Sequence, residues 1–90
     1  MTAHELFAIF DETCREYGVT HQEIRFGSTM SYTTSPNAQY SVTLARMVFL
    51  HRAWRAEAPA SLTASMLRMA SRSVRGWFAD FRARQARRAA

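Results

Sequence analysis

Apolar residues recur at helical spacing from the start of the chain. They are Leu6, Ile9, Phe10, Thr13 and Tyr17, with Thr13 as the one polar member. Thr2 and Glu5 before them have the spacing of a capping box, in which a hydroxyl and a carboxylate satisfy free backbone N–H groups. Gly18 follows as a stop signal. The pattern predicts a helix over about residues 3–17.

The next stretch, VTHQEIRFG, predicts a short second helix. Thr20 and Glu23 repeat the capping-box spacing, Ile24 faces inward, and Gly27 ends the helix. Residues 28–40 are rich in Ser, Thr, Asn and Pro and lack a helical stripe. We expect a loop there, with an extended piece at Tyr32 to Thr34.

The remaining half predicts three more helices. Ser41 caps a long helix that runs to about Glu57, and Pro59 separates it from a short helix capped by Ser61. Ser71 caps the last helix. The long helix carries one apolar stripe: Leu44, Met47, Val48, His51 and Trp54. The last helix carries another at i, i+3, i+4 and i+7: Val74, Trp77, Phe78 and Phe81.

No segment has a convincing strand pattern, so we expect an all-α fold: a compact five-helix domain over residues 1–90. The hydrophobic content of 48% favours a packed globule over disorder. Cys14 is the single cysteine, which excludes an internal disulfide framework and favours a reducing, cytoplasmic location. No apolar run is long enough to span a membrane, and the acidic N-terminal stretch is unlike a signal peptide.

Charge divides the chain into two unlike halves. Residues 1–45 carry two arginines against five carboxylates, a net charge of −3, whereas residues 46–90 carry ten arginines against two carboxylates, a net charge of +8. All twelve basic residues are arginines. Such asymmetry indicates a surface built for a polyanion, and nucleic acid is the commonest such partner.

Residues 61–82 have the pattern of a helix-turn-helix, with a short helix, a turn near Ala70 and a second helix. If the last apolar stripe is buried, the outward residues are Arg72, Ser73, Arg75, Gly76 and Ala79. The predicted recognition helix, about 72–84, then lies in the major groove of double-stranded DNA. The predicted DNA-binding residues are Arg46, Ser61, Ser71, Arg72, Ser73, Arg75, Arg82, Arg84, Arg87 and Arg88.

These residues have different expected tasks. Arg72, Ser73 and Arg75 contact bases or groove walls, and Ser71 lies at a helix N-terminus that favours phosphate. The later arginines supply phosphate affinity. Gly76 costs a helix interior about 1 kcal/mol, which a close approach to DNA or to a neighbouring helix would explain. The alternative is that the arginines form only a solvated face.

Nothing in the sequence indicates an enzyme. His4, His21 and His51 are scattered, without the spacing of metal ligands, and Cys14 is their only possible companion. No activated-nucleophile signature or phosphate-cradling glycine loop occurs. We therefore expect no metal site and no cofactor.

Residues 6–85 resemble the C-terminal DNA-binding domain of the bacterial replication initiator DnaA, a relative of the Trp-repressor helix-turn-helix. The matching motifs are Gly18-Val19-Thr20 with Ile24, Ala45-Arg46, Ser61-Leu62 and Ser73-Val74. The resemblance implies this fold and general DNA binding. The family's Arg-Asp-His base-reading set falls on Met69, Ala70 and Ser71, and the counterpart of its basic loop has only Arg25. Recognition of the initiator's own DNA box is therefore not implied. A shorter resemblance to the third helix of a homeodomain fails at Asp80, where that family has an adenine-reading Asn, so a homeodomain is not implied.

Activators of alphaproteobacterial gene-transfer-agent and phage-type gene clusters carry an N-terminal part that resembles the same domain. The resemblance implies a transcription regulator, either as these ninety residues alone or as one domain of a longer protein. A replication-initiation accessory factor is an alternative. A second alternative is a protein-interaction module whose acidic first helix, with Phe7 and Asp11 exposed, docks RNA polymerase or another regulatory protein. Membrane binding through the basic last helix is the least favoured reading, since its aromatic residues are needed in the core.

Overall fold

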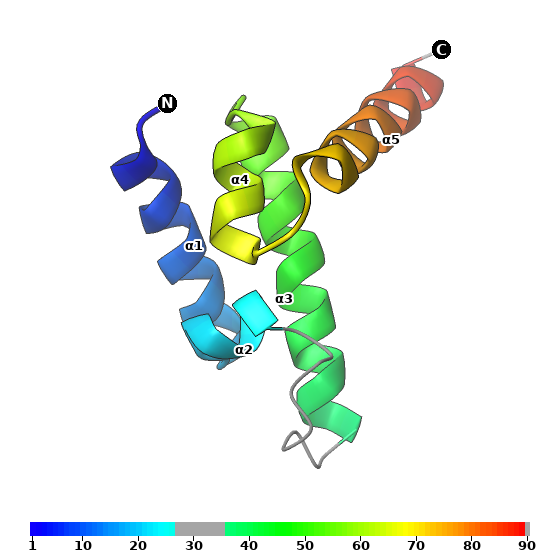
Figure 1. Ribbon diagram of the computed structural model, residues 1–90. Helices are drawn as coiled ribbons and strands as arrows, with labels where there is room; N and C mark the ends of the chain where they lie inside the picture. Colours follow the sequence, from blue (N-terminus) through cyan, green and yellow to red (C-terminus); the bar gives the residue numbers. More distant parts are fainter. Residues whose placement is uncertain (27–35, 90) are drawn as a thin grey trace.

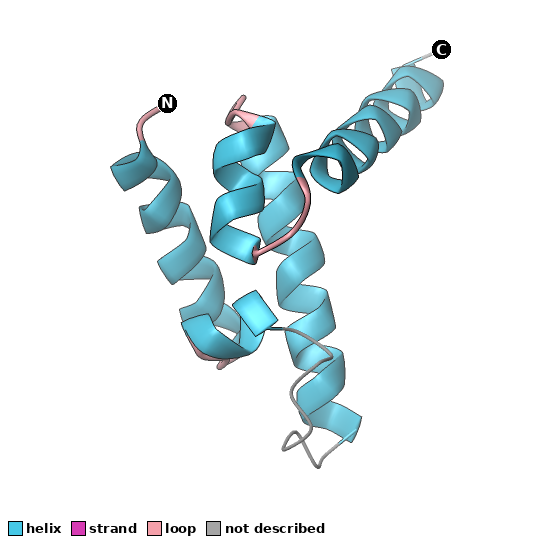
Figure 2. Ribbon diagram, viewed as in Figure 1, coloured by secondary structure: helices cyan, strands magenta, loops and turns pink. Residues whose placement is uncertain are grey.

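The protein is an all-α bundle, as the sequence predicts. The structure, a computed structural model, describes residues 1–26 and 36–89, and these residues form five helices and no strand. The helices are α1 (Ala3–Tyr17), α2 (His21–Phe26), α3 (Pro36–Arg55), α4 (Ala60–Leu67) and α5 (Ser71–Ala89). Short loops join α1 to α2, α3 to α4 and α4 to α5 (Figure 2).

The long helix α3 is the centre of the bundle, because each of the other four helices packs against it (Figure 1). α1 and α4 cover α3 on one side, and α2 also packs against it. α5 packs against α3 near the C-terminal end of α3. Phe10 of α1 meets Phe49 of α3 edge to face, with ring centroids 5.1 Å apart. The core also contains Leu6, Cys14, Ile24, Ala45, Leu50, Ala53, Ala58, Ala64, Leu67, Val74 and Phe81.

Both predicted capping boxes are present. The Glu5 backbone N–H donates to the Thr2 hydroxyl, and the Thr2 N–H donates to the Glu5 carboxylate. The same reciprocal pair joins Thr20 and Glu23 at 3.0 Å in each direction. These bonds satisfy backbone donors that have no partner within the helix, so the starts of α1 and α2 are set by local sequence.

Three helices end in the same hydrogen-bonded turn, in which a residue in the left-handed conformation reverses the chain. Gly18 (φ 65°), Glu57 (φ 61°) and Arg68 (φ 54°) occupy this position after α1, α3 and α4. In each case the following N–H donates back five residues, as Ala58 does to the carbonyl of Ala53. Only the first of the three uses glycine, the residue that adopts this conformation without steric cost.

The predicted boundaries of α3 are wrong. The helix begins at Pro36, so the expected loop does not extend over residues 36–40, and Ser41 lies inside the helix instead of capping it. Proline suits the first helical position, where its missing N–H has no partner anyway. At the other end the helix stops at Arg55, because Glu57 adopts the left-handed conformation. The predicted stop at Gly27 and the extended piece at Tyr32 to Thr34 lie outside the described residues.

The predicted apolar stripe of α3 is also not the main buried one. The buried residues are Val42, Ala45, Phe49, Leu50 and Ala53. His51, in the predicted stripe, is exposed, and the other four members are only partly buried. A central helix contacts neighbours on several sides, so one of its apolar stripes faces the core while a second is covered only in part.

Two predicted serine caps are wrong by one or two positions. α4 begins at Ala60 after Pro59, which makes Ser61 the second helical residue. α5 begins at Ser71 itself, and the Ala70 carbonyl accepts from the Val74 N–H. The apolar stripe of α1 is confirmed, with Leu6, Phe10 and Thr13 buried.

The two glycines that the structure describes have opposite backbone requirements, which predicts opposite effects of the same substitution. Neither glycine has an atom within 4 Å of an added Cβ. Gly18→Ala is expected to lower the free energy of unfolding by about 1 kcal/mol, since φ is 65° there. Gly76→Ala, inside α5, is expected to raise it by about 1 kcal/mol. Urea denaturation of both variants measures this, and a shift of the same sign in both contradicts the described backbone.

Candidate nucleic-acid interface

α4 and α5 are joined by a three-residue turn, Arg68–Ala70, as the helix-turn-helix pattern predicts. Arg68 ends α4 in the left-handed conformation, and Ser71 starts α5. The two helices pack against each other, and both pack against α3. α5 is therefore held by two neighbours along its first half.

The first half of α5 is anchored by its apolar stripe. Val74 and Phe81 are buried, and Trp77 and Phe78 are half-buried against the core. The Phe81 ring lies 5.2 Å from His51 and 5.7 Å from Trp54, measured between centroids, and both partners belong to α3. Trp77 packs beside it at 6.0 Å. Residues 82–89 are all exposed, and α5 runs away from the body of the protein toward its C-terminal end (Figure 1).

The residues predicted to face outward are exposed. They are Arg72, Ser73, Arg75, Gly76 and Ala79. The structure adds a feature of this face, a line of small residues at alternating spacings of three and four: Gly76, Ala79, Ala83 and Ala86, all exposed. Residues so spaced share one side of a helix. Along this line no side chain extends beyond Cβ, so the backbone of α5 is open to close approach.

Arginines flank this line of small residues. Arg72, Arg75, Arg82 and Arg87 are exposed on α5. The one carboxylate of α5, Asp80, is half-buried and forms an ion pair with Arg84 at 3.0 Å. Arg84 and Arg88 fall three and seven residues after Phe81, on the anchored side of the helix, and line a hollow between α5 and α3. The predicted phosphate contacts therefore divide between two sides of α5.

The other three predicted residues lie apart from this face or at its edge. Arg46, on α3, is half-buried and donates to the Ile24 carbonyl, which ties α3 to α2. Burial lowers the pKa of Arg46 below its ordinary value. Ser61 is exposed on α4, and Ser71 is partly buried at the start of α5. Their contact with DNA stays a prediction.

Carboxylates of the acidic half are partly neutralised by basic groups from both halves of the chain. Asp11 pairs with Arg15 at 2.8 Å and with His21 at 2.9 Å. Glu16 pairs with Arg52 of α3 at 2.6 Å. Asp11 was expected to be exposed, and its side chain is instead only 28% exposed. Phe7 is exposed as expected, at 46%.

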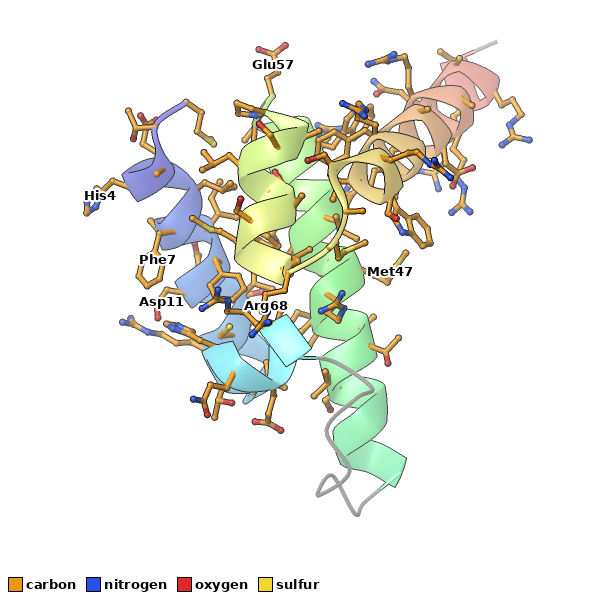
Figure 3. The ribbon with its side chains drawn as sticks, viewed as in Figure 1. His4, Phe7, Asp11, Met47, Glu57 and Arg68 are labelled. Atoms are coloured by element: carbon orange, nitrogen blue, oxygen red, sulfur yellow. The ribbon has the colours of Figure 1, made fainter. Side chains whose placement is uncertain are left out.

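The hollow between α3 and α5 brings together residues that were not predicted to share a site. Met47, Val48 and Trp54 of α3 line it opposite Phe81 of α5. In Figure 3 Met47 lies on the side of α3 toward α5. In the sequence these α3 residues belong to the predicted apolar stripe of the long helix. The sequence signal for an exposed use was the two arginines, Arg52 and Arg55, placed among them.

Cys14 and the potential metal ligands of the described residues show no sign of an activated site. Cys14 is buried, and desolvation raises the pKa of its thiol to about 11, the reverse of what activates a nucleophile. Within residues 1–26 and 36–89, no three metal-ligating side chains gather into a group. None of the helices in that part of the chain has both the length and the apolar composition to cross a membrane.

Comparison of the chain with protein-family models, with curated proteins and with solved structures finds no significant match. The function is therefore inferred from the arrangement of the residues themselves.

Because Phe81 anchors α5, its loss is expected to cost far more than loss of an exposed ring. Phe81→Ala is expected to lower the free energy of unfolding by about 3–5 kcal/mol. Phe7→Ala, at a phenylalanine that is 46% exposed, is the matched control and is expected to cost about 1 kcal/mol or less. Equal losses in urea denaturation would mean that α5 is not held through Phe81.

Proposed function

We propose that this chain is a double-stranded DNA-binding domain of a transcription regulator, with α5 as its recognition helix. The observation that carries the proposal is the outward face of α5. That face presents a line of small residues, Gly76, Ala79, Ala83 and Ala86, flanked by four exposed arginines. A solvated face of an ordinary helix has no need of an exposed glycine in its interior.

The face suits a groove for physical reasons. The major groove admits a helix, and small side chains let the helix backbone approach base edges and phosphates closely. Arg72 and Arg75, one turn apart, present guanidinium forks that donate two parallel hydrogen bonds to guanine or to phosphate. The alternative explanation for Gly76 is a close approach to a neighbouring helix. No atom lies within 4 Å of a Cβ added at Gly76, so packing against another described segment does not explain the glycine.

Two further features of the chain support a transcription regulator. The helix-turn-helix arrangement of α4 and α5 is the unit by which many regulators read DNA. The resemblance of residues 6–85 to the DNA-binding domain of DnaA implies the same use, and activators of gene-transfer-agent clusters are the regulators it suggests. A cytoplasmic location follows from this proposal. In the proposed complex Arg72, Ser73 and Arg75 recognise bases, and Arg82 and Arg87 contact phosphates.

A second candidate function is docking of a partner such as RNA polymerase through α1. The exposed Phe7 favours it, but its acidic neighbour Asp11 is already engaged by Arg15 and His21. The DNA proposal explains more of the surface, because most of the net positive charge lies on α3 and α5.

Salt-dependent binding tests the proposal directly. We expect the chain to bind a random-sequence duplex in fluorescence anisotropy, with log K falling against log salt at a slope of about −5 if about six phosphates are contacted. Arg75→Ala is expected to weaken binding by about 1–3 kcal/mol on a specific site, or to reduce the slope by about 1 if it contacts phosphate. Arg15→Ala removes the same charge from α1, where the side chain is 81% exposed, and is expected to leave binding nearly unchanged. Absence of binding at low salt would refute the proposal.

Gly76→Ala gives an independent test, because stability and affinity should move in opposite directions. The added methyl is expected to stabilise α5, yet it lies where the proposal brings DNA closest, and a loss of about tenfold in affinity corresponds to about 1.4 kcal/mol. Ala79→Ser is a milder companion on the same line. A more stable Gly76→Ala variant with unchanged affinity would remove this face of α5 from the interface.

A further inference from the structure

α3 and α5 diverge after Phe81 and leave a groove between them. We call it the α3–α5 groove; it has a cavity volume of about 380 Å³. Its apolar floor is made by Met47, Val48, Trp54 and Phe81. Its rim carries four arginines, Arg52 and Arg55 from α3 and Arg84 and Arg88 from α5. No carboxylate belongs to its lining.

The groove continues past Trp54 into a second hollow of about 640 Å³. The two hollows share Trp54, Arg55 and Gln85. The second one adds Phe78, Ala58 and Arg82, and its lining includes one carboxylate, Glu57. An elongated occupant therefore meets apolar surface on both sides of the Trp54 ring.

Two of the four rim arginines are already neutralised. Arg52 pairs with Glu16 at 2.6 Å, and Arg84 pairs with Asp80 at 3.0 Å. Arg55 and Arg88 form no ion pair with residues 1–26 or 36–89. Both flank the apolar floor, one on each helix. The groove thus offers two cationic groups around a floor large enough for an apolar side chain.

We propose that the α3–α5 groove docks an acidic amphipathic segment of a partner protein. In this arrangement an aromatic or branched aliphatic side chain of the partner lies on Met47, Trp54 and Phe81, and its carboxylates pair with Arg55 and Arg88. Aromatic residues, methionine and arginine are the types that are enriched at protein interfaces and that dominate their binding energy. Charge complementarity selects an acidic partner, because the lining holds four arginines and no carboxylate, and Arg55 and Arg88 are not paired with a described carboxylate.

DNA is the less suitable occupant. Arg84, Gln85 and Arg88 follow Phe81 by three, four and seven residues, so they continue the anchored stripe of α5. The line from Gly76 to Ala86 lies on the other side of the helix. A duplex seated on that line leaves the α3–α5 groove open, so DNA and the acidic segment are expected to bind at the same time.

A second copy of the chain is also less suitable. Among the side chains that the structure describes, the most exposed large apolar ones are Met1 and Phe7, on the acidic half. Asp11, one turn after Phe7, is held by Arg15 and His21, so the surface around Phe7 offers the groove little free negative charge. The occupant is therefore expected to be a different protein.

The test uses the full chain and a fluorescein-labelled synthetic peptide with Leu and Phe at i, i+3, i+4 and i+7 and Glu elsewhere. Two control peptides replace every Glu with Gln, or every Leu and Phe with Ala. At physiological salt we expect the acidic peptide to bind with a Kd of about 10 μM and both controls to bind at least about tenfold more weakly.

Matched variants locate the peptide on the protein. Arg55→Glu, in the groove, is expected to weaken peptide binding about tenfold or more, and Met47→Ala is expected to weaken it several-fold without changing the charge. Arg75→Glu makes the same charge change on the outward face of α5 and is expected to alter peptide affinity by less than about twofold while weakening duplex binding. Circular dichroism and thermal melting verify that each variant folds.

Four outcomes would overturn the proposal. Equal weakening by Arg55→Glu and Arg75→Glu, or equal binding of the Gln and Glu peptides, would show that no specific groove contact exists. Displacement of the peptide by duplex, together with loss of duplex binding in Arg55→Glu, would assign the groove to phosphate. A wild-type dimer in sedimentation that Arg55→Glu converts to monomer would assign it to a second copy. Peptide binding without any duplex binding would refute the DNA proposal alone, so the two failures are distinguishable.

Discussion

The contact of Phe81 with His51 and Trp54 determines what α5 can do. Phe81 is the last buried residue of the apolar stripe on α5, and its ring packs on His51 and Trp54 of α3. Every later described residue of the helix is exposed. One buried ring therefore separates an anchored first half, whose orientation is set by α3 and α4, from a second half that extends from the body. Both proposed binding surfaces depend on this division: the outward face needs a helix held at a constant angle, and the α3–α5 groove exists because the second half leaves the core.

Much of this arrangement can be predicted from local sequence because its signals are local. Thr2 and Glu5, and Thr20 and Glu23, form their capping boxes within one turn, and the stripe Val74, Trp77, Phe78 and Phe81 lies on one side of one helix. The exposure of Arg72, Arg75 and Gly76 follows from that stripe by helical geometry alone. For these residues the sequence pattern and the tertiary packing favour the same structure.

The errors arise where the structure depends on contacts between distant segments. Glu57 and Arg68 adopt a left-handed conformation that their side chains disfavour, so no glycine marks the ends of α3 and α4, and Pro59 only shows that α3 ends somewhere before it. α3 carries two apolar stripes, and which one is buried is decided by the positions of the other four helices. The groove was missed for the same reason: Met47 and Trp54 have the composition of core residues, and only the divergence of α5 leaves them uncovered.

The exposed second half of α5 has a consequence for the folding of the helix itself. From Arg82 onward the helix contains four arginines within seven residues, and like charges three or four residues apart destabilise a helix. Helical segments without tertiary contacts are weakly stabilised in water, so these last turns are expected to be the least stable part of α5 in the free protein. Any anion that neutralises the arginines removes this repulsion, whether it is a phosphate or a carboxylate. The helix content of residues 82–89 should therefore rise when DNA or the acidic segment binds. Binding of either ligand then lowers the entropic cost of ordering this segment when the second ligand binds.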